Sequence, residues 1–368
     1  MENNHVTALE IDLNAIAANF NYFKSKLHNS TKALVVVKAF GYGSDAVNIA
    51  KFLDSKVAYF AVAYIDEGIA LRSGGITSPI IVLHPQKSNF DKIIEHRLEP
   101  NIYSLNLLRA FIETAKILLL SNYPIHLKFN TGLNRLGFSQ HEVQQILPLI
   151  HNQKEIQVKS IFSHIAASED LNERPFTLQQ ISAFNTISEE FKNLSPIPLK
   201  HMLNTSGILN YATEAQFDMV RLGIGLYGFG NLASETKKLQ NVLTLKSVIS
   251  QIHTIKKGDT VGYNRAFKAT ATLKTATIPI GHADGISRHL GNGVGYIYIQ
   301  NQKAHIVGNV CMDMIMVDIS SIDCKEGDKV IIYKNQQHIE ALALAINTIP
   351  YELLTAISQR VRRVLKKS

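Results

Sequence analysis

Lys38 is the residue whose position most clearly indicates chemistry. It follows the apolar run at residues 34–37, LVVV, which is typical of a strand buried on both faces. A lysine at the end of such a strand either finds an anion or loses its proton, and a neutral amine forms Schiff bases with carbonyl compounds. Gly41 and Gly43 follow, so the backbone can turn closely around a group held by Lys38. Taken alone, the stretch also fits a strand that ends in a solvated lysine.

Further polar residues fall where other strands are expected to end. They are Tyr42 after the first strand, Lys128 and Arg135 after the fifth, His164 after the sixth, Asn204, Thr205 and Ser206 after the seventh, and Arg221 with Gly223 in the eighth. Small hydroxyl residues and glycine after the last two strands of a barrel bind phosphate through hydroxyls and backbone N–H groups. A reactive lysine opposite a phosphate site predicts pyridoxal 5'-phosphate as cofactor, because that molecule carries an aldehyde and a phosphate.

The elements that position these residues alternate between short apolar runs and helical patterns. Strands are expected at residues 34–37, 59–64, 79–83, 100–103, 124–129, 158–164, 199–204 and 219–224, with helices such as 142–150 and 177–191 between them. Eight β/α units in about 200 residues predict a closed (β/α)8 barrel of the TIM type. A doubly wound open sheet is the alternative.

Two domains are expected, because 368 residues exceed the size of one ordinary core. We assign the barrel to residues 1–235 and a mainly β-strand domain to residues 236–368, where short strands alternate with Gly and Asp turns and a helical segment occupies 340–349. Residues 8–12 are expected to form a short strand that can pair with the second domain. Asp12 is then expected to cap the helix that follows.

Composition excludes several classes of protein. Hydrophobic residues make up 46% and charged residues 18%, as in soluble globular proteins. We expect neither a membrane span nor a secretory signal, because no apolar run is long enough and the start lacks a basic region followed by an apolar core. Cys311 and Cys324 lack zinc spacing and fit a reducing compartment, so we expect a cytoplasmic protein without a metal site.

Two features are compatible with nucleotide or nucleic-acid binding and are interpreted otherwise. The net charge is +8, but the only dense cluster of cations is the tail RVRRVLKKS at residues 360–368. We interpret it as the solvated end of a terminal helix, whose dipole the cations complement, and expect no nucleic-acid partner. Gly223, Gly225 and Gly228 match G-x-G-x-x-G, but no amphipathic helix follows them, so dinucleotide binding is rejected.

Several separate blocks of sequence share one resemblance. The blocks are VVVKAFGYG, LKFNTGLNRLGF, FSHIAASED, LNTSGI, VRLGIGLYG, VGYNRAF, IGHADGISR, VGNVCMDMIMVD and PYELLTAISQRV. Together they resemble the alanine racemases, whose pyridoxal-phosphate barrel precedes a β domain, over residues 8–365. The resemblance implies an isomerase that interconverts L-alanine and D-alanine and supplies D-alanine for peptidoglycan.

The resemblance also implies a role for each matched residue. Around the cofactor it places Lys38 at the aldehyde, His164 against the ring, Arg221 at the pyridine nitrogen, and Tyr42, Asn204, Thr205, Gly223, Ile224 and Tyr351 around the phosphate. Arg135 would hold the cofactor's phenolic oxygen and the substrate carboxylate, braced by Lys128, the lysine that is often carbamylated in this family. In the β domain the matched residues are Tyr263, Met312 and Asp313, with Met312 beside the substrate side chain.

One position departs from the family pattern. The family usually has tyrosine where this chain has His282, in a place associated with substrate access. The departure bears on gating and substrate selectivity rather than on the chemistry.

Racemisation requires a proton to leave one face of the substrate Cα and another to arrive at the opposite face. Lys38 serves one face, and the resemblance implies Tyr263 for the other, in a two-base mechanism. A phenol is a poor base at neutral pH, so this role requires cationic or hydrogen-bonding neighbours. Because Tyr263 lies in the β domain, the resemblance implies a head-to-tail homodimer with shared active sites. Arg221 cannot accept a proton, so the ring nitrogen stays neutral, which favours racemisation over transamination or decarboxylation.

Three other functions remain open on the sequence. A racemase of serine, or of several amino acids, differs from an alanine racemase only by small changes in the pocket. A barrel protein that carries pyridoxal phosphate without turnover would lack the β domain and Tyr263. A decarboxylase of basic amino acids shares both domains, but it has an acidic residue where Arg221 stands and a reactive cysteine, for which Cys311 is the candidate.

Overall fold

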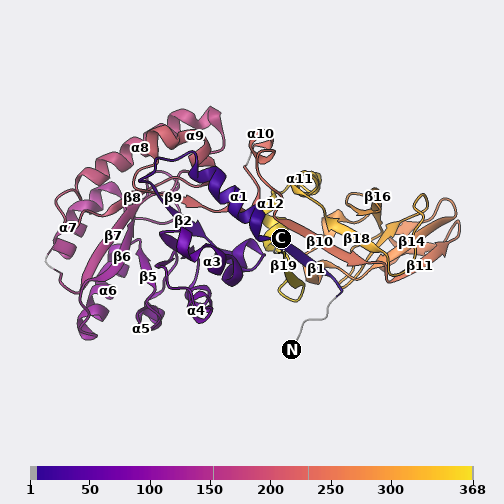
Figure 1. Ribbon diagram of the computed structural model, residues 1–368, viewed down its shortest axis with the longest axis horizontal. Coiled ribbons are helices and arrows are strands. Elements are labelled where there is room, and N and C mark those ends of the chain that lie inside the picture. The colour runs from indigo at the N-terminus through magenta and orange to yellow at the C-terminus, as the bar shows by residue number, and fades with distance from the viewer. Residues whose placement is uncertain (1–5, 152, 231, 367–368) are drawn as a thin grey trace.

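The computed structural model describes residues 6–151, 153–230 and 232–366. Residues 1–5 and 367–368, which entered the expectations of no secretory signal and of a helical tail, lie outside the described residues. The chain forms a parallel barrel followed by a mainly β domain (Figure 1).

Eight parallel strands close the barrel, because the first pairs with the last and Leu34 lies opposite Arg221. The strands are β2 (Lys32–Val36), β3 (Tyr59–Val62), β4 (Ile80–Val82), β5 (Glu99–Ile102), β6 (Tyr123–Lys128), β7 (Ile156–Phe162), β8 (Leu199–His201) and β9 (Met219–Leu222). Every residue of β3 and β4 is buried, as their continuous apolar runs require. The predicted barrel is confirmed, and the open-sheet alternative is wrong.

Helices surround the barrel strands (Figure 1). They are α1 (Leu13–Lys24), α3 (Ala46–Leu53), α4 (Ile65–Ser73), α5 (Phe90–Glu95), α6 (Leu105–Ile117), α7 (Val143–His151), α8 (Arg174–Glu189) and α9 (Thr205–Ala215). Asp12 caps α1 as predicted, since its carboxylate accepts hydrogen bonds from the backbone N–H groups of Asn14 and Ala15, each at 2.9 Å. The helix buries Ile16 and Phe20. No helix within the described ranges is long and apolar enough to cross a bilayer.

The second domain is built on a nine-stranded sheet with the order β11-β14-β17-β16-β15-β18-β10-β1-β19. Its strands are β1 (Ala8–Asp12), β10 (Leu243–Val248), β11 (Gln251–Ile255), β14 (Leu273–Ile278), β15 (Tyr296–Ile299), β16 (Gln302–Val307), β17 (Ile315–Asp318), β18 (Lys329–Tyr333) and β19 (Arg362–Lys366), and β12 (Thr260–Val261) pairs separately with β13 (Phe267–Lys268). β1 lies between β10 and β19. The first strand of the described residues therefore belongs to the second domain's sheet and precedes the barrel in the sequence.

Among the described residues, the helices outside the barrel's ring are α10 (Ala233–Thr236), α11 (Gln336–Ala345) and α12 (Pro350–Thr355). The helical segment predicted at 340–349 overlaps α11. The domain boundary placed at residue 235 falls within α10 and stays a prediction. Figure 1 shows α12 near β19, between the barrel and the far end of the sheet.

The basic tail differs from the prediction. Residues 362–366 form β19, an edge strand parallel to β1, so the expected helix end is wrong. Part of the reason lies in contacts that are distant in the sequence: the Glu10 carboxylate binds Lys366 at 2.5 Å and Lys246 at 2.6 Å. Cations along an edge strand also discourage pairing with other chains.

Candidate active site

A cavity of about 420 Å³ lies at the carboxyl ends of the barrel strands. Eleven of the predicted site residues line it: Lys38, Tyr42, Lys128, Arg135, His164, Asn204, Thr205, Arg221, Gly223, Ile224 and Tyr351. Tyr351 comes from α12, and the others come from the barrel. The structure therefore gathers these residues in one place, while their individual roles stay predictions.

Lys38 begins a left-handed turn, α2 (Lys38–Tyr42). The φ angles of Ala39, Phe40, Gly41 and Tyr42 are 53°, 55°, 63° and 53°. This backbone region is unfavourable for residues other than glycine, so contacts from elsewhere must hold the turn in place. The turn places both Lys38 and Tyr42 in the wall of the cavity.

The surroundings of Lys38 favour the neutral amine that the predicted chemistry needs. Burial lowers the pKa of Lys38 and the charge of Arg135 lowers it further, while the carboxylate of Glu67 opposes them. Glu67 also accepts hydrogen bonds from the backbone N–H groups of Ala39 at 2.6 Å and Ala63 at 2.7 Å. The same carboxylate therefore ties the start of the left-handed turn to the end of β3.

Positive charge dominates the cavity. Lys38, Lys128, Arg135 and Arg221 line it, and none of its lining residues in the described part of the chain is Asp or Glu. Burial lowers the pKa of Lys128 to about 8, with further contributions from Arg135, Arg221 and Lys38. Burial and then the charge of Arg135 lower the pKa of Arg221 to about 9. Of these four cations, Lys128 and Arg221 are buried, and such an excess of positive charge in one cavity fits an anionic ligand.

One end of the cavity suits a phosphate group. Thr205 Oγ1 accepts hydrogen bonds from the backbone N–H groups of Gly225 at 3.2 Å and Gly223 at 3.4 Å, which orders the chain after β9. Gly223 has no room for a side chain, because a Cβ there would lie 2.5 Å from Tyr42 Oη. The rings of Tyr42 and Tyr351 lie 6.2 Å apart. Glycine backbone beside two phenols, in a cationic cavity, fits pyridoxal phosphate.

Arg221 stands at the end of a hydrogen-bonded chain across the inside of the barrel. Its Nη1 donates to His201 Nδ1 at 2.8 Å, because a guanidinium can only donate. Burial, followed by the charge of Arg221, lowers the pKa of His201 far below its ordinary value. The neutral imidazole then carries its proton on Nε2 and donates to Ser160 Oγ at 3.0 Å.

The series of hydrogen bonds continues from Ser160 to a carboxylate. Ser160 Oγ donates to His126 Nδ1 at 2.6 Å, and His126 Nε2 donates to Glu99 Oε2 at 2.7 Å. We call this series of hydrogen-bonded side chains, which runs from Arg221 to Glu99, the inner chain. Each N–H or O–H in it donates in the direction from Arg221 toward Glu99. The arrangement compensates a buried guanidinium through neutral groups without placing a carboxylate in the cavity wall.

His164 is a second acceptor for Arg221, whose Nη2 donates to His164 Nδ1 at 2.9 Å. Burial, followed by the charges of Arg221, Arg135, Lys128 and Lys38, lowers the pKa of His164 well below its ordinary value. A neutral imidazole held in this way can pack against a flat ring without adding charge.

Four buried residues of the inner chain escaped prediction: Glu99, His126, Ser160 and His201. One signal was present, because His126 precedes Lys128 by two residues on β6, and side chains two apart on a strand share a face. Tyr64 and His84 also line the cavity and were missed. Their strands end without a cation or a small hydroxyl residue to draw attention.

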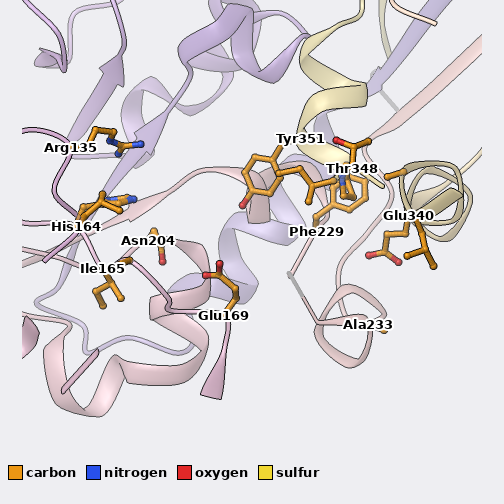
Figure 2. Close-up of a pocket in the computed structure, with 16 residues that line it drawn as sticks. Arg135, His164, Ile165, Glu169, Asn204, Phe229, Ala233, Glu340, Thr348 and Tyr351 are labelled. Atoms are coloured by element: carbon orange, nitrogen blue, oxygen red, sulfur yellow. The ribbon is translucent and has the colours of Figure 1, made fainter. Parts of the chain in front are cut away.

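A wider cavity of about 630 Å³ shares Arg135, His164, Asn204 and Tyr351 with the first. Figure 2 shows the first three on one side and Tyr351 across from them, next to Phe229. Tyr351 therefore lines both the cavity that contains Lys38 and the wider one.

Four predicted residues of the second domain lie apart from this site. Tyr263 and Met312 are 72% and 58% exposed, and with Asp313 they line a different cavity of about 620 Å³. His282 is exposed and lines neither cavity. Within one chain, Tyr263 and Lys38 thus belong to separate cavities.

Both domains match known families. Residues 11–230 match the family described as alanine racemase, N-terminal domain, and residues 242–365 match alanine racemase, C-terminal domain. This chain belongs to the alanine racemase family. The resemblance seen in the sequence blocks is thereby confirmed, and with it an isomerase of alanine that depends on pyridoxal phosphate.

Relatives and solved structures support the match over nearly the whole chain. Alanine racemase 1 of Oceanobacillus iheyensis is 33% identical over 367 residues, covering 96% of this chain and 96% of the relative. An alanine racemase structure from Clostridium difficile 630 has a TM-score of 0.92 at 34% identity, covering 98% of this chain and 96% of that one. An alanine racemase from Bartonella henselae with covalently bound pyridoxal phosphate has a TM-score of 0.88 at 29% identity, covering 98% and 99%. These alanine racemases share both domains, which disfavours a barrel-only cofactor carrier.

Proposed function

We propose that the protein interconverts L-alanine and D-alanine by a two-base mechanism, with Lys38 and Tyr263 on opposite faces of the substrate. The observation that carries this proposal is the cavity at the carboxyl end of the barrel, where a half-buried lysine of lowered pKa lies with three further cations beside a glycine backbone. Membership of the alanine racemase family supports the reaction, and the geometry supports the residues.

Pyridoxal phosphate, when bound, supplies an electron-withdrawing ring that acidifies the α-proton of the amino acid. Each group at the cavity wall has a proposed contact: Lys38 binds the aldehyde end covalently, Arg221 donates to the ring nitrogen, His164 supports the ring face, and Tyr42, Asn204, Thr205, Gly223, Ile224 and Tyr351 surround the phosphate. Arg135 binds the substrate carboxylate, and Lys128 braces it.

Lys38 moves the proton on one face of the substrate Cα. Its lowered pKa supports this role, because only the neutral amine is a base. Arg135, fixed to the substrate carboxylate, holds the Cα in front of Lys38. A second base must then stand on the far side of the substrate.

We infer that Tyr263 reaches the active site of a second copy of the chain, in a head-to-tail homodimer. Its side chain is 72% exposed and lies outside the cavity of Lys38, so it is available to another barrel. Met312 and Asp313 share its cavity and would approach the other copy with it. Met312 would then crowd the substrate side chain and favour a methyl group, and His282 would stand where substrate enters.

We also infer a cytoplasmic enzyme that supplies D-alanine for peptidoglycan. Cys311 and Cys324 are free thiols, which supports a reducing compartment. The partner that the cavity suits is a small amino acid rather than a nucleic acid or a membrane.

A spectrum combined with a chiral assay tests the proposed function. The purified protein is scanned for the absorption band of lysine-bound cofactor and then given L-alanine, L-serine or L-lysine, while D-product and carbon dioxide are followed. We expect the band, D-alanine as the fastest-formed product and no carbon dioxide. Lys38→Ala should abolish the band and the turnover, whereas Lys32→Ala, at the exposed start of the same strand, should keep both.

Two results would contradict the proposal. A band without any D-amino acid would leave a cofactor-binding protein. Carbon dioxide released from L-lysine would indicate a decarboxylase.

A further inference from the structure

Arg363, in the basic tail, makes more contacts than are expected of a cation on an exposed edge strand. It lies on β19 opposite Leu9, and its guanidinium donates to five backbone carbonyl oxygens. Two acceptors belong to the barrel, Gly43 at 2.6 Å from Nη2 and Ser44 at 3.0 Å from Nε. Three belong to the segment after α12: Ile357 at 2.8 Å from Nη2, Val361 at 2.7 Å from Nη1, and Ser358. One side chain thus joins two parts of the chain more than 300 residues apart.

On the barrel side, Arg363 holds the end of the left-handed turn that starts at Lys38. Gly43 is the residue that closes α2, and the guanidinium carbon lies 5.3 Å from the centre of the Phe40 ring in the same turn. Glu67 already holds the first peptide of the turn, at Ala39. A left-handed turn is intrinsically unfavourable for L-residues, so these two anchors at its ends help to hold it in place.

On the other side, Arg363 holds the chain immediately after the helix that carries Tyr351. Its acceptors Ile357 and Ser358 come after Ala356, the residue that caps the end of α12. The turn and this helix are also packed without a gap, because a Cβ at Gly43 would overlap the Leu354 carbonyl.

We propose that Arg363 is a positioning residue that fixes Tyr42 on the turn and Tyr351 on α12 relative to each other, and so sets the affinity of the phosphate end of the cofactor site. This inference rests on the proposed function, in which both tyrosines contact that phosphate. A planar guanidinium has five N–H groups and can donate to five carbonyl oxygens arranged around it, whereas a lysine ammonium has three donors on one nitrogen. The C-terminal strand thereby acts on a site in the barrel.

The test measures cofactor affinity rather than turnover. Apo-protein is titrated with pyridoxal 5'-phosphate and, separately, with pyridoxal, which keeps the aldehyde and lacks the phosphate. Arg363→Ala should weaken pyridoxal-phosphate binding roughly tenfold or more, because charged hydrogen bonds are lost, and should change pyridoxal binding much less. Arg363→Lys should fall between Arg363→Ala and wild type. Arg362→Ala, an exposed neighbour on the same strand, should bind both ligands as wild type does.

The possible outcomes distinguish a positioning role of Arg363 from a general structural one. Unchanged pyridoxal-phosphate affinity in Arg363→Ala, or an equal loss for both ligands, would overturn the positioning role and leave a general structural one. If Arg363→Ala does not fold, Arg363→Lys decides by the same ratio of the two affinities. If the wild-type protein racemises alanine and the Arg363 variants bind pyridoxal phosphate as tightly as wild type, only this inference is contradicted. If the wild-type protein does not bind pyridoxal phosphate, the proposed function is contradicted.

Discussion

Arg221 is fixed by four acceptors around its guanidinium. They are His201 and His164, together with the backbone carbonyls of Ser163 and Met202. A cation held in this way can donate a hydrogen bond to a ring nitrogen but cannot take its proton. A carboxylate in its place would keep that nitrogen protonated and would stabilise a carbanion for longer. We therefore propose that this side chain favours prompt return of the proton to the substrate Cα.

Exchanging this residue should change the type of reaction. We expect Arg221→Glu to raise transamination relative to racemisation, measured as the ratio of pyruvate to D-alanine formed from L-alanine. Arg221→Lys keeps the positive charge and should leave the ratio close to that of wild type. An unchanged ratio in Arg221→Glu, with cofactor still bound, would contradict the role given to Arg221.

Residues that touch the cavity were largely predictable, and those behind them were not. Lys38, Lys128 and Arg221 are charged residues in or directly after apolar strands, and the barrel brings the carboxyl ends of such strands together. His201 and Ser160 lie in two other strands of the same barrel, β8 and β7, but a buried neutral histidine or serine has no pattern that separates it from the core. Their importance follows only from the hydrogen bonds that the closed barrel creates.

Strands β5 to β9 cooperate through the inner chain that ends at Glu99. Ser160 is its middle member, so Ser160→Ala would leave the His201 N–H and the His126 Nδ1 buried without their partner. We expect the free energy of unfolding to fall by about 1–3 kcal/mol, as for a buried hydrogen bond removed on one side. We also expect more pyruvate per D-alanine, because His201 no longer has a fixed tautomer to receive Arg221.

Denaturant unfolding and the product ratio together check this prediction. Ser160→Thr keeps the hydroxyl and should restore the product ratio even if the added methyl group costs some stability. A stability loss in Ser160→Ala with an unchanged product ratio would show that the inner chain only supports the barrel.

Two elements illustrate the limit of local sequence patterns. Gly41 and Gly43 predicted a close turn after Lys38, but its left-handed course also includes Ala39 and Phe40, which no local preference favours. The tail at 360–368 contains no strand signal strong enough to outweigh a helical interpretation. Both elements depend on partners far along the chain: Glu67 and Arg363 for the turn, and β1 for the tail.

At the scale of the whole molecule, the sequence predicted both architectures and a strand at residues 8–12 that can pair with the second domain, but it did not predict the pairing of that strand with β19. The repeated alternation of strand and helix fixed the barrel, because each β/α unit is local. The second sheet takes β1 from the start of the chain and β19 from near its end, an arrangement that requires pairing over more than 350 residues. The two kinds of site residue are also separated, since Tyr263 and Lys38 line different cavities within one chain.

Mixed dimers test the central claim, that one active site contains Lys38 of one copy and Tyr263 of another. Lys38→Ala and Tyr263→Phe chains with different affinity tags are produced together, and dimers that carry both tags are purified. Each variant alone should lose about 100-fold or more of its D-alanine formation, as for loss of a general acid or base. In a mixed dimer one of the two sites has both wild-type residues, so about half of the wild-type activity should return. Mixed dimers as inactive as their parents, or a Tyr263→Phe protein of full activity, would contradict the account.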